Sequence, residues 1–176
     1  MRALADTDRI RRLMEALAVA SEVPGRIYFT GGVSAVLLGW RTTTVDVDLK
    51  LVPDSDALLR AIPLLKEKLS VNVELAAPDQ FIPELPGWRE RSVFITQIRH
   101  LSFRHYDFYS QALSKLERQH VKDLLDVHEM LRRALIEPGE LLRLFSAIEP
   151  ELYRYPAIDP PSFRAAVEEL VASRAP

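Results

Sequence analysis

Two aspartates spaced two residues apart are the side chains best placed for metal-assisted chemistry. The segment from Val45 to Leu51 alternates apolar and polar residues, which is the pattern of a β-strand with one buried face. It predicts that Asp46 and Asp48 leave the strand on one face, with Cα atoms about 6.6 Å apart. Both carboxylates can then reach one hard cation such as Mg²⁺, or a pair of such ions. On its own, a pair of this kind is more often part of a solvated strand face.

The same alternation on a later segment supplies a third carboxylate. Residues 71–75 alternate in the same way, which places Asn72 and Glu74 on the polar face. If the two strands are neighbours in one sheet, Glu74 completes a three-carboxylate cluster with Asp46 and Asp48. The residues expected in the core are Val45, Val47, Leu49 and Leu51 on the first strand and Val71, Val73 and Leu75 on the second.

A glycine pair upstream suits a phosphate group. Residues 26–30 are β-branched and aromatic enough for a short strand, and Gly31-Gly32 separates them from an apolar helical stretch at 33–40. Free N–H groups and the positive end of a helix dipole favour an anion at such a turn. Ser34, in the first helical turn, adds a hydroxyl donor. Carboxylates for Mg²⁺ and a glycine turn for a triphosphate are the two halves of a phosphoryl- or nucleotidyl-transfer site.

The order of these motifs is similar to that of a known superfamily. Gly31-Gly32, a short helix, the polar segment 41–44 and then Asp46-Val47-Asp48-Leu49 resemble the polymerase-β-type nucleotidyltransferases. The chain looks most like the minimal bacterial members related to the AbiEii-type toxins of abortive-infection and toxin–antitoxin systems. The clear resemblance covers residues 26–76. A weaker one lies at residues 113–126, where those relatives carry a Lys on one helix and a Lys-Asp pair on the next, here Lys115 and Lys122-Asp123.

The resemblance implies a nucleotidyltransferase fold, an NTP substrate and a Mg²⁺ cofactor. Asp46 and Asp48 would bind the metal, and Glu74 would be the third catalytic carboxylate, at a position where Asp is more usual. Nucleotide-binding residues would be Gly31, Gly32, Ser34, Arg41, Lys115 and Lys122. Relatives modify RNA, including tRNA ends, or proteins, so either is an expected acceptor, and a cognate antitoxin is an expected partner.

The three basic candidates have alternative interpretations. Lys115, Arg118, Lys122, Asp126 and Glu129 recur at helical spacing and form one polar stripe if residues 115–129 are a single helix. That stripe is either a solvated face or a surface from which Lys115 and Lys122 reach a triphosphate or an RNA end. Arg41 can pair with Asp48, contact substrate or form a structural ion pair.

The predicted elements give an α+β domain with a small mixed sheet, flanking helices and a C-terminal helical extension. A helix is expected at 7–20 with Thr7 as its N-cap, and a second from residue 53 to about 69 that Pro63 breaks or restarts. Further strands are expected at 91–98 and 102–108. From residue 110 the pattern is helical, which predicts an α/β core at 1–109 and a helical region at 110–176 packed on it.

Composition excludes several classes of protein. The 176 residues contain no cysteine and carry a net charge of −2, which excludes disulfide scaffolds, thiolate metal sites and cysteine nucleophiles. The longest purely apolar run is residues 35–38, far short of the ~20 residues of a membrane span. No signal peptide is visible, so a cytoplasmic protein without membrane contact is expected. Only residues 84–122 are locally basic, with seven Lys or Arg against four Asp or Glu.

Other catalytic motifs are incomplete. The sequence Gly32-Val33-Ser34-Ala35-Val36 lacks the last glycine of a nucleophile elbow. His128-Glu129 is followed by Arg132 where a zinc protease needs its second histidine. The sequence therefore favours a Mg²⁺-dependent nucleotidyltransferase. The alternatives are a catalytically silent nucleotidyltransferase fold that binds a partner protein, and a nucleic-acid-binding protein without catalysis.

Overall fold

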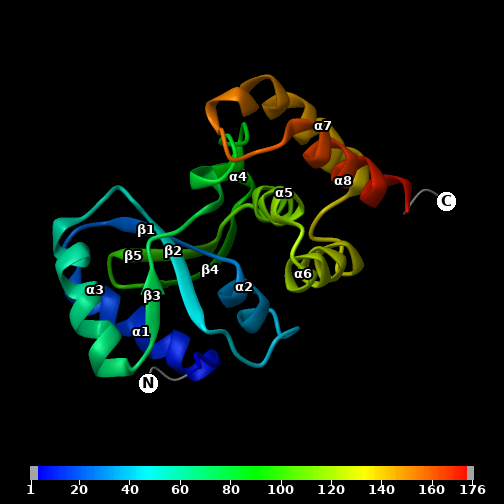
Figure 1. Ribbon diagram of the computed structural model, residues 1–176. Coiled ribbons are helices and arrows are strands. Elements are labelled where there is room, and N and C mark those ends of the chain that lie inside the picture. The colour runs from blue at the N-terminus through cyan, green and yellow to red at the C-terminus, as the bar shows by residue number, and fades with distance from the viewer. Residues whose placement is uncertain (1–3, 174–176) are drawn as a thin grey trace. The chain divides into compact units, whose positions relative to one another are not determined.

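The computed structural model of the chain describes residues 4–173 (Figure 1). It is an α+β structure with a five-stranded mixed sheet, so the predicted class and the small mixed sheet are confirmed. The chain divides into two compact units. The first unit is Met1–Ala77 with Ser92–Tyr106, and the second is Pro78–Arg91 with Asp107–Pro176. The segment 78–91 thus belongs to the same unit as the C-terminal helices, whereas the sequence pattern predicts it as part of the α/β region 1–109.

The first unit contains the whole sheet, whose strand order is β3-β2-β1-β5-β4. β1 runs antiparallel to β2 and parallel to β5, while β2 is parallel to β3 and β5 antiparallel to β4. Apolar residues of α1 and α3 form one buried cluster with strand residues, so these helices cover one face of the sheet. The elements are α1 (Thr7–Ala20), β1 (Gly25–Thr30), α2 (Gly32–Leu37), β2 (Asp46–Val52), α3 (Asp56–Leu69), β3 (Asn72–Glu74), β4 (Val93–Ile98) and β5 (Leu101–His105).

Both long helices of the first unit differ in detail from the sequence prediction. The N-cap of α1 is Asp6 rather than Thr7, because the Asp6 carboxylate accepts a hydrogen bond from the Arg9 backbone N–H at 2.9 Å. α3 passes through Pro63 without a break. Leu58 and Ile62 are buried on the same helix, and this packing offsets the one backbone hydrogen bond that proline removes.

The alternation of β2 is as predicted within the strand and fails just outside it. Val47, Leu49 and Leu51 are buried, and the polar residues between them are half-buried on the other face. Val45 and Leu75, both expected in the core, are 63% and 45% exposed. Each lies one residue beyond the end of its strand, where the two-residue period no longer fixes the direction of the side chain.

The second unit is helical, and one expectation about it is wrong. Residues 115–129 are not one helix, because α5 ends at Arg118 and Gln119 adopts a left-handed conformation with φ 54°. The basic and acidic residues of that segment therefore lie on two helices and not on one stripe. The elements are a 3₁₀ turn at Pro78–Gln80, α4 (Trp88–Arg91), α5 (Phe108–Arg118), α6 (Val121–Arg132), α7 (Pro138–Ile148), a second 3₁₀ turn at Glu149–Arg154 and α8 (Pro160–Ala172).

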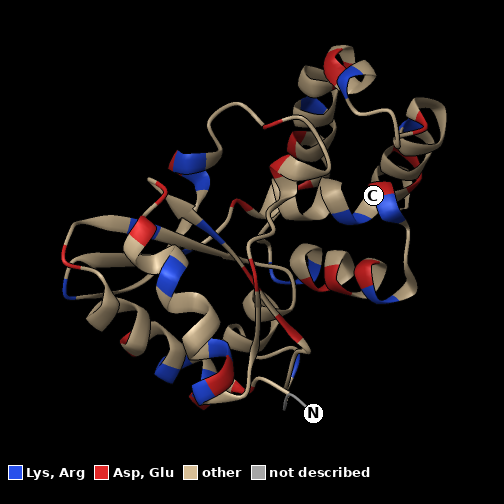
Figure 2. Cartoon of the chain, turned by 60° about the vertical axis from the view of Figure 1, so that its left-hand side comes forward, with Lys and Arg blue, Asp and Glu red and all other residues tan. Residues whose placement is uncertain are grey.

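Neither the charges nor the apolar residues are concentrated in one long segment of the described chain (Figure 2). Basic and acidic residues are interspersed along the helices of both units (Figure 2). Among the residues that the structure describes, no helix has the length and apolar character needed to cross a membrane.

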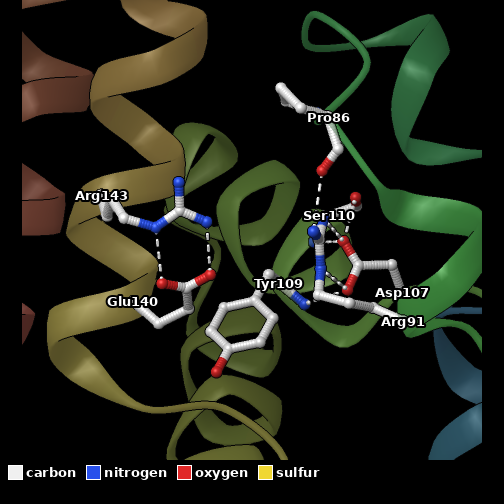
Figure 3. A network of polar contacts seen from close by, with 7 residues as sticks. All are labelled: Pro86, Arg91, Asp107, Tyr109, Ser110, Glu140 and Arg143. Carbon is white, nitrogen blue, oxygen red and sulfur yellow. Dashed lines mark hydrogen bonds and ion pairs between the residues drawn. The ribbon is translucent and has the colours of Figure 1, made fainter.

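A buried ion pair in the second unit explains why the fourth and fifth strands are shorter than predicted. Asp107 caps α5 by accepting hydrogen bonds from the Ser110 N–H and hydroxyl, and it also accepts two from Arg91, at 3.0 and 2.9 Å (Figure 3). Arg91 ends α4 and donates in addition to the Pro86 carbonyl. Both residues are thus committed to helix ends, and the strands stop short of them at Val93 and His105.

Replacing Asp107 with Asn tests this ion pair. We expect Asp107→Asn to lower the free energy of unfolding by about 3 kcal/mol, because the guanidinium of Arg91 loses its buried counter-charge. Urea denaturation followed by circular dichroism measures the change. Glu140→Gln is the matched control, since its ion pair with Arg143 (Figure 3) is open to water and should leave the midpoint unchanged. Equal effects of the two substitutions would contradict the assignment.

Candidate functional site

Three carboxylates lie on one face of the sheet in the first unit. In the parallel pair of β2 and β3, Asp46 is opposite Asn72 and Asp48 is opposite Glu74. Residues opposite each other in a sheet point to the same face, and so do residues two apart on a strand. The structure therefore brings Glu74 to the side of the sheet that carries Asp46 and Asp48.

The amide of Asn72 links two of these carboxylates. Its Nδ2 donates to Asp46 Oδ1 at 2.7 Å and to Glu74 Oε1 at 2.9 Å. An amide between two carboxylates offsets part of their mutual repulsion and fixes the direction of both. The sequence placed Asn72 on this face without giving it a role. The signal that could have found it is its position between two alternating apolar residues, one strand away from the aspartates.

The glycine turn lies beside Asp48. Gly31 has a φ of 62°, a conformation that side chains disfavour, and a Cβ built on it would be 3.0 Å from Asp48 Oδ2. The turn after β1 is thus in close contact with the carboxylate that leaves β2. A larger residue at position 31 would push this carboxylate aside.

The second glycine of the turn is required by packing against Thr44. A Cβ at Gly32 would lie 2.1 Å from Thr44 Oγ1, which is far inside van der Waals contact. The Thr44 hydroxyl donates to the Asp46 carbonyl at 3.0 Å. Thr44 therefore fills the space beside Gly32 and also holds the first residue of β2.

Arg41 reaches the same turn. Its Nη1 lies 3.7 Å from the ideal Cβ position of Gly32, and its backbone N–H donates to the Ala35 carbonyl at 3.2 Å. The side chain is half-buried. A positive charge thus lies next to the glycine turn, on the chain segment that leads from α2 into β2.

Ser34 points into the interior of the first unit. It is fully buried, and its Oγ lies 2.9 Å from His105 Nδ1 on β5. Burial lowers the pKa of His105 to about 4, so the imidazole is neutral at pH 7. The pair joins the first turn of α2 to β5, two segments 71 residues apart in sequence, and sequence periodicity gives no signal of it.

The two lysines of the expected site belong to the second unit. Lys115 is buried, and its Nζ lies 2.8 Å from both Asp123 Oδ1 and Asp126 Oδ2 on α6. Arg118 adds a third ion pair, to Asp123 at 3.2 Å. This network holds α5 against α6, and it is neither a solvated stripe nor a free cationic surface. Lys122 is exposed at the start of α6.

The donor chemistry of the sheet face fits a hard divalent cation. Asp46 and Asp48 are half-buried carboxylates on one face, and Mg²⁺ prefers one or two carboxylates together with water and substrate phosphates. Among residues 4–173, no group of three or more potential metal ligands is already gathered around one point. A cation held by Asp46 and Asp48 would take its remaining ligands from water or substrate.

Comparison with known proteins gives no match. No protein-family model, no curated protein and no solved structure matches this chain.

The contact of Gly32 with Thr44 gives a test of the turn. We expect Gly32→Ala to lower the free energy of unfolding by about 2 kcal/mol, because the new methyl group overlaps Thr44. Adding Thr44→Gly should recover part of that loss, and a double-mutant cycle in urea measures the coupling. Gly139→Ala is the control, since a Cβ there meets no atom within 4 Å. Additive effects of Gly32→Ala and Thr44→Gly on the free energy of unfolding would show that the contact is absent.

The buried imidazole predicts a pH dependence of stability. The unfolded chain protonates His105 near its ordinary pKa of 6.5, but the folded protein does so only near 4. The unfolded state therefore binds more protons between these values, and stability falls as the pH drops from about 6.5 to about 4, by about 3 kcal/mol in total.

His105→Asn tests this, because it keeps a hydrogen-bonding group near the Nδ1 position but does not titrate. We expect the variant to lose less stability than wild type over this pH range in urea titrations. His100→Asn, at an exposed position, is the control and should follow wild type. A variant His105→Asn with the full wild-type pH dependence would contradict the assignment.

Proposed function

We propose that this chain is a Mg²⁺-dependent nucleotidyltransferase with a polymerase-β-type nucleotidyltransferase fold. The observation that carries the proposal is the position of Asp46, Asp48 and Glu74 on one face of β2 and β3, beside the glycine turn that follows β1. Carboxylates that could hold Mg²⁺, next to a turn that could receive phosphate, suit transfer to or from a triphosphate.

In this proposal each group of the first unit has a separate task. Asp46 and Asp48 would hold Mg²⁺, which when bound offsets the charge of the triphosphate and lowers the pKa of an acceptor hydroxyl. The backbone at Gly31 and Gly32 would receive the leaving phosphates, because neither residue carries a side chain of its own at the turn. Arg41 would contribute positive charge at the same place. Ser34, being buried against His105, would support the turn from behind rather than touch phosphate.

The reaction transfers a nucleoside monophosphate to an acceptor hydroxyl. The hydroxyl oxygen forms a bond to the α-phosphorus of the NTP, and the bond from that phosphorus to the bridging oxygen breaks, with its electron pair leaving on pyrophosphate. The hydroxyl proton passes to Glu74 or to water. Glu74 suits this because it is exposed and is held toward the aspartates by Asn72.

The acceptor class follows from the resemblance of the motifs to AbiEii-type toxins. We propose an RNA, such as a tRNA end, or a protein as acceptor, in a toxin–antitoxin or related system. The net charge of −2 favours an acceptor recognised over a small area, since a large RNA footprint needs many basic contacts. Lys122 of the second unit is a candidate contact. Lys115 is assigned to the α5–α6 network instead, because two carboxylates already neutralise it.

Removal of one proposed metal ligand tests the function. The protein is incubated with Mg²⁺, each of the four α-³²P-labelled NTPs and total tRNA or lysate protein, and labelled products are separated by electrophoresis. We expect label in an acceptor with wild type and a loss of more than about 100-fold with Asp46→Asn, because about 3 kcal/mol or more of transition-state stabilisation depends on the metal.

Asp54→Asn is the matched control, because Asp54 is an exposed aspartate just beyond the far end of β2 and should leave labelling unchanged. Equal loss in both variants would remove Asp46 from the proposed site. Wild-type protein that neither labels an acceptor nor binds NTP in the presence of Mg²⁺ would contradict the proposal. That result would favour a silent fold that binds a partner protein.

A further inference from the structure

The two edges of the sheet differ in how far they are protected against pairing with another strand. One edge is β3, which has three residues and carries Asn72 and Glu74. The other is β4, which has six residues, Val-Phe-Ile-Thr-Gln-Ile, with no charge and no proline. Natural edges are usually short, charged, interrupted by proline or covered. Among the described residues β4 pairs with β5 alone, and its one protective feature is a bulge between Phe94 and Thr96.

The bulge determines which side chains of β4 face α1. Thr96 is opposite Phe103 and Ile98 is opposite Leu101, and both partners are buried in the core under the helices. Phe94 is opposite Arg104 and so lies on the other face. It is 54% exposed.

A groove follows β4 on the α1 side. It has a volume of about 430 Å³, and its walls include Arg11, Met14 and Glu15 of α1 and Ile95, Thr96 and Ile98 of β4. A strand added beside β4 would direct every second side chain toward this groove. Recognition by strand addition uses this combination, in which main-chain hydrogen bonds give affinity and pockets for alternate side chains give specificity.

The charges around β4 define the strand that fits. Residues 92–106, which form the β4–β5 hairpin, contain Arg99 and Arg104 but no Asp or Glu. The Arg104 guanidinium lies over the Phe94 ring, 5.7 Å from its centroid. Its Nε is buried and has no hydrogen-bond partner among the described residues. The Nε is closed to an incoming group, but a carboxylate arriving beside Phe94 would lie near the positive charge of this half-buried guanidinium, whose Nη1 donates to the Ser92 carbonyl at 3.2 Å. A second copy of the chain would instead place one basic hairpin beside another.

We propose that the β4 edge binds an extended segment of a partner protein. That segment alternates apolar residues, which enter the groove, with acidic residues, which face Arg104 on the other side of the sheet. This surface lies along β4, the edge of the sheet opposite to β3, which carries Glu74 of the proposed transferase site.

Designed peptides test the proposal on the full chain. Three fluorescein-labelled nonapeptides are compared by fluorescence anisotropy: one alternating valine with glutamate, one alternating valine with lysine, and the glutamate peptide with its central valine replaced by proline. We expect the glutamate peptide to bind at least about tenfold more tightly than the other two, because the lysine peptide repels the hairpin and proline interrupts pairing.

Two substitutions locate the binding. Thr96→Lys places a charge on the groove side of the edge. It should lower the affinity for the glutamate peptide at least about tenfold. Leu64→Lys, at an exposed position of α3, is the control and should leave binding unchanged. Arg104→Gln should bring the affinities of the glutamate and lysine peptides to within about threefold. If a variant fails to fold, the ranking of the three peptide affinities for the wild-type protein still tests the proposal.

Three results would overturn the proposal. The first is equal affinity for the glutamate and lysine peptides, and the second is equal affinity for the peptide that contains proline. The third is a wild-type dimer in analytical ultracentrifugation that Thr96→Lys converts to monomer, because a second copy would then occupy the edge. Immobilisation of a spin label at Gln97→Cys by the glutamate peptide, with no change at Leu64→Cys, would support it; the chain has no cysteine of its own to interfere.

Discussion

The two-residue period of β2 ties the core of the first unit to its acidic face. Burying Val47, Leu49 and Leu51 under α1 and α3 forces the side chains between them onto the opposite face. A register shift of one residue would bury the carboxylates and expose the aliphatic residues, which would cost several kcal/mol for each unpaired charge. The position of the two aspartates therefore depends on the hydrophobic core, and no separate interaction is needed to hold them on this face.

Close contacts then bring the remaining groups to that face. Any side chain at Gly32 would overlap Thr44, so packing requires a glycine at this position. Thr44 in turn donates to the Asp46 carbonyl. The turn and the start of β2 are thus packed directly on each other. Asn72 extends the arrangement to β3 by bonding Asp46 and Glu74.

The parts of the structure that depend on local pattern were predictable, and those that depend on long-range pairing were not. Alternation identified β2 and β3 and the shared face of Asp46, Asp48 and Glu74, because a strand's period is visible in a few residues. The left-handed Gln119 that separates α5 from α6 is not signalled by a glycine or proline, so helical spacing alone predicts one stripe that contains both Lys115 and Asp126. The partnerships of Ser34 with His105 and of Arg91 with Asp107 join distant segments. Single-sequence periodicity carries no information about such pairs.

The residues proposed for catalysis also have a consequence for the sheet itself. Asn72 and Glu74 occupy two of the three positions of β3, and a short polar edge is a poor template for a further strand. The polar residues Asn72 and Glu74 therefore protect this edge from unwanted pairing. The opposite edge, β4, carries no charged residue. Its six residues and the adjacent groove have the features of a surface that can pair with another strand. Such an edge is open to unwanted pairing unless something covers it, and the basic charge of the β4–β5 hairpin is the reason for proposing an acidic strand as its partner.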